Sequence, residues 1–169
     1  MGLLHIYCGD GKGKTTASLG LAVRAAGASM RVCFLQFMKG GDTAELNALK
    51  HIPGIQVMRC DRQYPFFSNM NEAEKSEIAA CHDRLLEEAF SGGFDMIVLD
   101  EFNCAYNFGL MNRRRAKELV MNGRGRAEII LTGRDPDDEF IRPADYVSEI
   151  KCVKHPFEKG IAARKGIEY

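Results

Sequence analysis

The stretch that decides the fold reads Gly9-Asp10-Gly11-Lys12-Gly13-Lys14-Thr15-Thr16. It follows an apolar run over residues 3–8 and opens a helix-like stretch over residues 15–26. Its three glycines let the backbone turn tightly, so that successive N–H groups and the start of the helix can converge on phosphate oxygens. The segment therefore predicts a P-loop that holds the triphosphate of a nucleotide, most simply ATP with Mg²⁺.

The side chains of this segment have separate expected tasks. Lys14 places a positive charge on the same anion, and the Thr15 hydroxyl can ligate the Mg²⁺ that bridges phosphate oxygens. Thr16 is either a residue of the first helical turn or a further phosphate donor. The usual pattern begins with glycine seven places before the Ser or Thr, where this chain has Cys8. A plain glycine turn between strand and helix is the alternative interpretation.

A second apolar run, over residues 96–100, ends in two carboxylates, Asp100 and Glu101. In P-loop proteins an acid at such a strand end lies beside the phosphate loop and completes the magnesium site. Either acid could meet the metal. Taken alone, the pair could also be a solvated strand edge or a helix cap.

Strand-like and helix-like stretches alternate along the whole chain. The strand-like runs cover residues 3–8, 31–37, 55–59, 96–100, 128–132 and 146–153, and the helix-like stretches cover residues 15–26, 43–50, 71–90 and 112–121. Alternation predicts a parallel sheet, and continuous apolar runs predict strands covered on both faces. We expect an α/β P-loop NTPase (RecA-like) fold with about six mostly parallel strands, helices on both faces, and ligand-side loops that include residues 101–107 and 133–138.

Length, charge and composition bear on the number of domains, the kinds of partner and the cellular location. The 169 residues suit one domain, 1–169, with residues 154–169 as a C-terminal tail packed on it. Lys plus Arg and Asp plus Glu both total 23, so no global field would gather nucleic acid or an anionic membrane. Because no signal peptide or membrane span is evident, a cytoplasmic location is expected.

The six cysteines never form a Cys-x-x-Cys pair, and four of them lie in apolar segments. We therefore expect reduced, buried thiols in preference to zinc ligands or disulfides.

Five motifs follow one another in a recognisable order. They are Gly9 to Thr16, Leu35-Gln36-Phe37-Met38-Lys39-Gly40, Val98-Leu99-Asp100-Glu101, Leu131-Thr132-Gly133-Arg134, and Val153-Lys154-His155-Pro156-Phe157 with Gly160 and Gly166-Ile167-Glu168-Tyr169. The first and third are generic to P-loop proteins, whereas the others are specific. In this order the chain resembles the P-loop class of ATP:corrinoid adenosyltransferases, also called cob(I)alamin adenosyltransferases, over nearly its whole length.

The resemblance implies transfer of the 5′-deoxyadenosyl group of ATP to the Co(I) of a reduced corrinoid, with inorganic triphosphate as the leaving group. In the family the triphosphate lies in the loop in reversed order, so the bond broken is at ribose C5′. Co(I) is itself a strong nucleophile, so the protein need only orient ATP and stabilise charge on the departing triphosphate. The resemblance also implies a homodimer and an electron donor such as a flavoprotein reductase. Whether the corrinoid is complete cobalamin or an earlier a,c-diamide stays open.

By motif, Lys12 and Gly13 line the phosphates, Lys14 and Thr15 hold triphosphate and Mg²⁺, and Glu101 completes the metal site. The remaining residues of the loop, Gly9, Asp10, Gly11 and Thr16, complete the expected ATP-binding set.

Arg134 is a candidate for a further triphosphate or substrate contact, with a surface salt bridge as the alternative. Gln36 and Lys39, at the end of the second strand, are candidates for corrinoid binding, although Gln36 could be a satisfied core amide.

The aromatic segment Tyr64-Pro65-Phe66-Phe67 lies where the family places bulky residues that shield the lower face of the corrinoid. Family members often have a tryptophan shortly afterwards, whereas this chain has none and shows Ser68-Asn69 instead. Phe66 or Phe67 could provide the shield. The alternative is a loop whose aromatic side chains pack into the core.

Two other functional classes share the phosphate loop. A switch ATPase would couple hydrolysis to a protein partner. A small-molecule kinase would need an acceptor site and a base beside the γ-phosphate.

Overall fold

In the computed structural model, residues 2–39 and 43–168 are described, and within them six strands form one parallel sheet. The order across the sheet is β3-β2-β4-β5-β1-β6. The strands are β1 (Leu4–Cys8), β2 (Val32–Gln36), β3 (Ile55–Arg59), β4 (Met96–Asp100), β5 (Glu128–Thr132) and β6 (Tyr146–Glu149). The predicted six-stranded α/β fold is confirmed.

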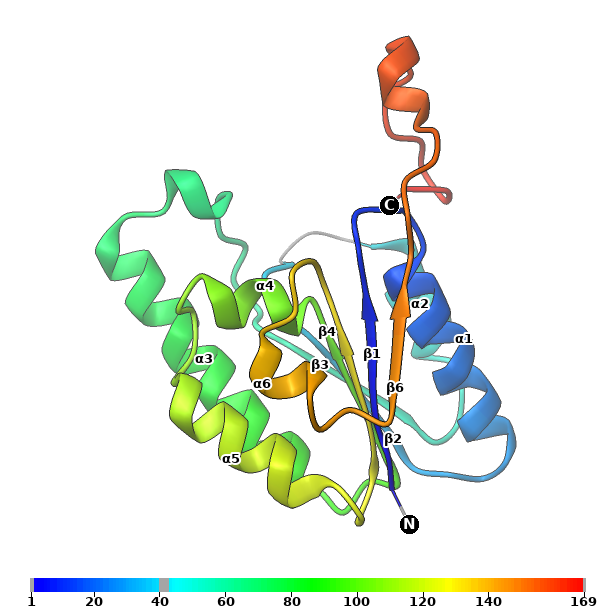
Figure 1. Cartoon of the computed structure of the whole chain (residues 1–169), viewed down its shortest axis with the longest axis vertical. Coiled ribbons are helices and arrows are strands. Elements are labelled where there is room, and N and C mark those ends of the chain that lie inside the picture. The colour runs from blue at the N-terminus through cyan, green and yellow to red at the C-terminus, as the bar shows by residue number, and fades with distance from the viewer. Residues whose placement is uncertain (1, 40–42, 169) are drawn as a thin grey trace.

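Helices cover both faces of this sheet. They are α1 (Lys14–Gly27), α2 (Ala44–Leu49), α3 (Glu72–Ser91), α4 (Phe102–Asn107), α5 (Arg113–Gly123) and α6 (Asp138–Ile141), with short 3₁₀ turns η1 (Phe67–Asn69) and η2 (Pro156–Lys159). Figure 1 shows α1 and α2 on one side of the sheet and α3 to α6 on the other.

Strand β4 shows why the apolar runs are continuous. Its Ile97 and Leu99 join the core beneath α3, α4 and α5, whereas Met96 and Val98 join the core beneath α1 and α2. Successive side chains of a strand point to opposite faces, so a strand with two covered faces needs apolar residues at every position.

The strand order brings three chain segments to one edge. Strand β5 lies between β4 and β1, with Leu131 paired in register with both Leu99 and Ile6. Because all three strands are parallel, their carboxyl ends face the same way. The phosphate loop after β1, Asp100 at the end of β4 and Thr132 at the end of β5 therefore meet.

Two short helices and one strand end differ from the sequence predictions. Residues 101–107 were expected to form a loop but contain α4, and α6 begins at the end of the second expected loop. Helices of six and four residues are too short to show a helical period, which explains the error. Strand β6 ends at Glu149, four residues earlier than predicted.

The prediction of reduced thiols is wrong for Cys60 and Cys81, which form a disulfide between the end of β3 and α3. Their Cα atoms are 6.2 Å apart, within the usual range. The two residues are separated by 21 positions, a spacing that matches no local motif. Cys8, Cys33, Cys104 and Cys152 are free thiols.

The segment after β6 extends beyond the carboxyl end of that strand and turns back, as the orange and red ribbon of Figure 1 shows. Residues 153–168 are all exposed. Its contacts with the domain include Lys12 to Glu168 and a hydrogen bond from the Cys152 N–H to Asp10, both at the phosphate loop. Packing of the tail on the domain stays a prediction.

Among the described residues, no helix is both long enough and apolar enough to cross a bilayer.

Candidate nucleotide-binding site

Packing against the end of β6 and a positive backbone angle explain the glycines of the phosphate loop. The N–H of Gly11 donates to the carbonyl of Ile150 at 2.8 Å, and a Cβ at Gly9 would come within 2.4 Å of that same oxygen. Gly13, just before α1, has φ 122°, a conformation that other residues rarely adopt. The loop therefore has the tight backbone that phosphate binding by N–H groups requires.

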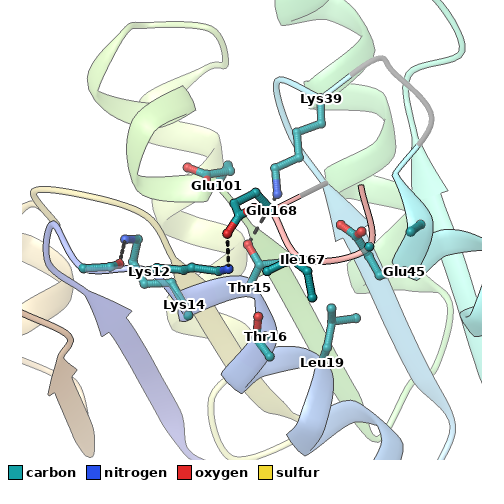
Figure 2. Close-up of a pocket in the computed structure, with 14 residues that line it drawn as sticks. Lys12, Lys14, Thr15, Thr16, Leu19, Lys39, Glu45, Glu101, Ile167 and Glu168 are labelled. Atoms are coloured by element: carbon teal, nitrogen blue, oxygen red, sulfur yellow. Dashed lines mark hydrogen bonds and ion pairs between the residues drawn. The ribbon is translucent and has the colours of Figure 1, made fainter. Parts of the chain in front are cut away.

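A cavity of about 530 Å³ opens over this loop, a size typical of small-molecule sites. Its lining residues are Gly11, Lys12, Gly13, Lys14, Thr15, Thr16, Leu19, Lys39, Ala44, Glu45, Glu101, Gly166, Ile167 and Glu168. Figure 2 shows Lys39 reaching Thr15 and Lys12 reaching Glu168 beside it, whereas the Lys14 ammonium is turned toward the Gly11 carbonyl. Most of the predicted ATP-binding residues are thus brought together, whereas Gly9 and Asp10 lie outside the lining.

The carboxylate of Asp100 is fully buried and accepts four hydrogen bonds. One oxygen accepts from the hydroxyls of Thr15 and Thr132, at 2.9 and 2.8 Å. The other accepts from the ammonium of Lys39 at 3.0 Å and the amide of Gln36 at 3.2 Å. A buried charge is tolerated only when it is paired in this way, so Asp100 ties three strand ends to the phosphate loop.

Glu101, the next residue, has a different environment. Its backbone is left-handed, with φ 60°, and its N–H donates to the Thr132 hydroxyl at 2.9 Å. Its half-buried side chain lines the cavity. The backbone turn thus sends Asp100 into the protein and Glu101 toward the cavity.

These oxygen donors suit Mg²⁺ in chemistry. Mg²⁺ is commonly held by one or two carboxylates together with substrate phosphates, and the cavity offers the Thr15 hydroxyl and Glu101, with Asp100 directly behind Thr15. Within the described residues no group of three His, Cys, Asp or Glu forms a site that could hold a metal by itself. Phosphate oxygens and water would supply the remaining ligands.

Two residues at the site were missed by the sequence reasoning. Thr132 contacts both Asp100 and the backbone of Glu101, although only Arg134 was singled out from its motif. A polar residue at the end of an apolar strand was the available signal. Glu168 was missed as well: its carboxylate accepts from Lys12 at 2.9 Å across 156 positions, and no local pattern predicts this contact.

Arg134 is exposed and does not line the cavity. It is close enough to Asp10 to affect that carboxyl: the backbone N–H of Cys152 lowers the pKa of Asp10, and the charge of Arg134 lowers it further.

The four candidates for corrinoid binding fall into two groups. Gln36 and Lys39 contact Asp100 at the phosphate cavity. Phe66 and Phe67 lie in the loop before α3, where Phe66 is 86% exposed. The Phe67 ring stacks on Phe108, with ring centroids 4.3 Å apart and planes at 6°. Phe67 thus lies against the end of α4, the helix that begins after Glu101.

The parallel sheet, the glycine loop after its first strand and the strand-end acid bound to Thr15 define the P-loop NTPase-like class of folds. The family model for "ATP:corrinoid adenosyltransferase BtuR/CobO/CobP" matches residues 1–169. The chain therefore belongs to the ATP:corrinoid adenosyltransferase family.

Individual relatives agree with this assignment. The chain is 32% identical over 176 residues to the corrinoid adenosyltransferase of Escherichia coli (strain K12), with 99% of this chain and 86% of the relative covered. The corrinoid adenosyltransferase CobA of Salmonella typhimurium gives the same identity and coverage. The corrinoid adenosyltransferase of Pseudomonas aeruginosa is 31% identical over 173 residues, covering 99% of this chain and 84% of the relative.

Proposed function

We infer that the chain transfers the 5′-deoxyadenosyl group of ATP to the Co(I) of a reduced corrinoid and releases triphosphate. The observation that carries this conclusion is the full-length family match, on a chain in which residues of the phosphate loop line a cavity. In the reaction the bond between ribose C5′ and the triphosphate oxygen breaks as a cobalt–carbon bond forms. Cobalt supplies the electron pair, changing from Co(I) to Co(III), and triphosphate leaves with the electrons of the broken bond.

The chain's own contribution to this step is electrostatic. Lys12, Lys14 and Lys39 all line the cavity, where their charges would stabilise the negative charge that grows on the departing triphosphate. The Lys14 ammonium donates to the Gly11 carbonyl at 2.8 Å, so it is already held over the loop. Positioned lysines need no reorganisation when the bond breaks, and no side-chain nucleophile is required.

We assign the Mg²⁺ site to the Thr15 hydroxyl and Glu101, with Asp100 orienting Thr15 from below. Bound there, the metal would neutralise phosphate charge. We assign Lys39 to the triphosphate and Gln36 to Asp100, since both contact that carboxylate. We place the corrinoid near Phe66 and Phe67, because the exposed ring of Phe66 adjoins a stacked pair that leads to α4.

Partners and location are further parts of the proposal. Because Co(I) must be formed by reduction, an electron donor such as a flavoprotein reductase is expected to supply it. The family resemblance supports a homodimer, and the use of ATP supports a cytoplasmic location.

One assay separates this function from a switch ATPase or a kinase. Protein is mixed with Mg-ATP and chemically reduced cobalamin, and the cobalt spectrum and the phosphate products are followed together. We expect adenosylated corrinoid and inorganic triphosphate in equal amounts. Phosphate or ADP without cobalt alkylation would contradict the proposal.

A matched pair of lysine variants ties the activity to the phosphate loop. Lys14→Ala is expected to lower kcat/KM for ATP at least about a hundredfold, since hydrogen bonds to charged groups contribute about 1.5–3 kcal/mol and charge stabilisation adds to this. Lys50→Ala removes the same charge from an exposed residue after α2 and should leave the rate unchanged.

A further inference from the structure

His82 is a buried residue of α3 that has no part in the chemistry described above. It is 1% exposed, and Phe37 packs against its ring edge to face, with centroids 4.9 Å apart. Its Nδ1 lies 2.8 Å from the carbonyl oxygen of Leu110, and its Nε2 lies 3.4 Å from the backbone nitrogen of Met38. Both ring nitrogens thus face backbone groups of other segments.

These two partners fix the tautomer. The Leu110 carbonyl can only accept, so Nδ1 carries the hydrogen, and Nε2 is left to accept from the Met38 N–H. Burial lowers the pKa of His82 to about 4, against the opposing effect of the Leu110 carbonyl. The ring is therefore neutral near pH 7, and Nε2 keeps the lone pair that this arrangement requires.

Met38 has an unusual backbone conformation. Its φ is 58°, in the left-handed region, which costs a residue other than glycine about 1 kcal/mol or more. Such a conformation persists only where the surroundings hold it. The hydrogen bond to His82 is a contact that does so.

The turn at Met38 determines where the next side chain goes. Lys39 reaches into the phosphate cavity, where its ammonium lies 3.0 Å from Asp100 and 3.3 Å from the Thr15 hydroxyl. Figure 2 shows Lys39 descending toward Thr15 from the end of β2. His82 is thus connected to the site through one backbone hydrogen bond and one left-handed residue.

We propose that His82 is a positioning residue for ATP binding: by accepting the Met38 N–H it holds the turn that aims Lys39 at the triphosphate. The inference rests on the proposed function, because it needs ATP in the cavity.

Two conservative substitutions separate the roles of the two ring nitrogens of His82. Gln can place its side-chain oxygen near the position of Nε2 and accept from Met38, whereas the shorter Asn can only replace the Nδ1 donor. With Mg-ATP binding measured by calorimetry, His82→Asn is expected to raise Kd about tenfold, and His82→Gln to raise it less than about threefold. Equal losses in both variants would overturn the proposal.

A double-mutant cycle with Lys39→Ala tests whether His82 acts on ATP binding through Lys39. Lys39→Ala alone should weaken ATP about tenfold or more, and His82→Asn should add nothing in that background. An unchanged Kd for Lys39→Ala, or a full additional loss in the double variant, would overturn the proposal. Failure of the wild-type protein to bind ATP would instead contradict the proposed function.

A variant on the same helix serves as the control for a general loss of stability. Leu85→Ala removes a buried α3 side chain and should lower the melting temperature without changing the Kd for ATP. If His82→Asn does not fold, His82→Phe keeps a ring in the core but accepts no hydrogen bond. It should then show the same tenfold loss, and a wild-type Kd would overturn the proposal.

Discussion

Asp100 and Glu101 are adjacent in the chain and carry the same charge, yet their surroundings give them different tasks. Asp100 is enclosed by donors from the ends of β2 and β5 and from the phosphate loop, whereas Glu101 borders the cavity. The left-handed backbone of Glu101 produces this division. An acid pair at a strand end was predictable from the sequence, but the division between the two acids was not, because it depends on one backbone angle.

Paired amide variants should separate the two tasks. Asp100→Asn leaves the Lys39 charge without its partner and should reduce the free energy of unfolding by about 1–3 kcal/mol. Glu101→Gln should leave the free energy of unfolding within about 0.5 kcal/mol of wild type while lowering kcat more than about tenfold. Urea unfolding and the cobalt assay measure the two effects. Similar stability losses in both variants would show that Glu101 is structural.

Among the elements, the six strands were predictable because each lies in a run rich in Val, Ile, Leu or Phe. Helices α1, α2, α3 and α5 were predictable because their stretches are bounded by glycine, proline or a capping residue such as Asn71 or Asn112. The short helices α4 and α6 were not, since one or two turns show no period; α2 is as short as α4 but was recognised from the stretch that ends before Pro53. Residues that act across long distances in the chain were missed for a related reason. No local pattern marks the contact of Glu168 with Lys12 or that of His82 with the Met38 backbone, whereas Thr132 had one signal, its place as a polar residue at the end of an apolar strand.

The C-terminal tail brings a carboxylate to the phosphate loop. Glu168 accepts hydrogen bonds from Arg164 and Lys12, which lower its pKa to about 2, so the tail keeps a negative charge at the rim of the phosphate cavity. Glu168→Gln removes this charge and releases Lys12. ATP should then bind about twofold to fivefold more tightly, the range expected of an exposed ion pair.

Glu158→Gln is the matched control, because it removes the same charge from η2 in the same tail. Its Kd for ATP should equal that of wild type. Weaker binding by Glu168→Gln would instead indicate that the tail helps to hold the nucleotide.

Over the whole molecule, the disulfide between Cys60 and Cys81 is a covalent link between the β3 end and α3. It closes the loop that contains Phe66 and Phe67, and the cysteine pattern alone did not predict it. Reduced thiols were expected because the six cysteines form no Cys-x-x-Cys pair and four lie in apolar segments, and neither observation says which distant cysteines approach one another.

Reduction of this disulfide should destabilise the oxidised protein. By loop-entropy arithmetic, a link across 21 positions contributes about 3 kcal/mol to the free energy of unfolding. Urea unfolding with and without dithiothreitol measures the difference. The double variant Cys60→Ser with Cys81→Ser should be insensitive to dithiothreitol, and a wild-type midpoint equally insensitive would contradict the link.

The place of β5 between β1 and β4 has a consequence for how the protein reaches its native state. The phosphate loop and its strand-end acid belong to strands that pair only through β5, a segment that follows both of them in the chain. Contacts between distant segments form slowly, because the intervening chain must first be ordered. The nucleotide site should therefore be among the last features to appear during refolding. Acquisition of ATP affinity, followed in real time, would mark the moment at which β5 enters the sheet.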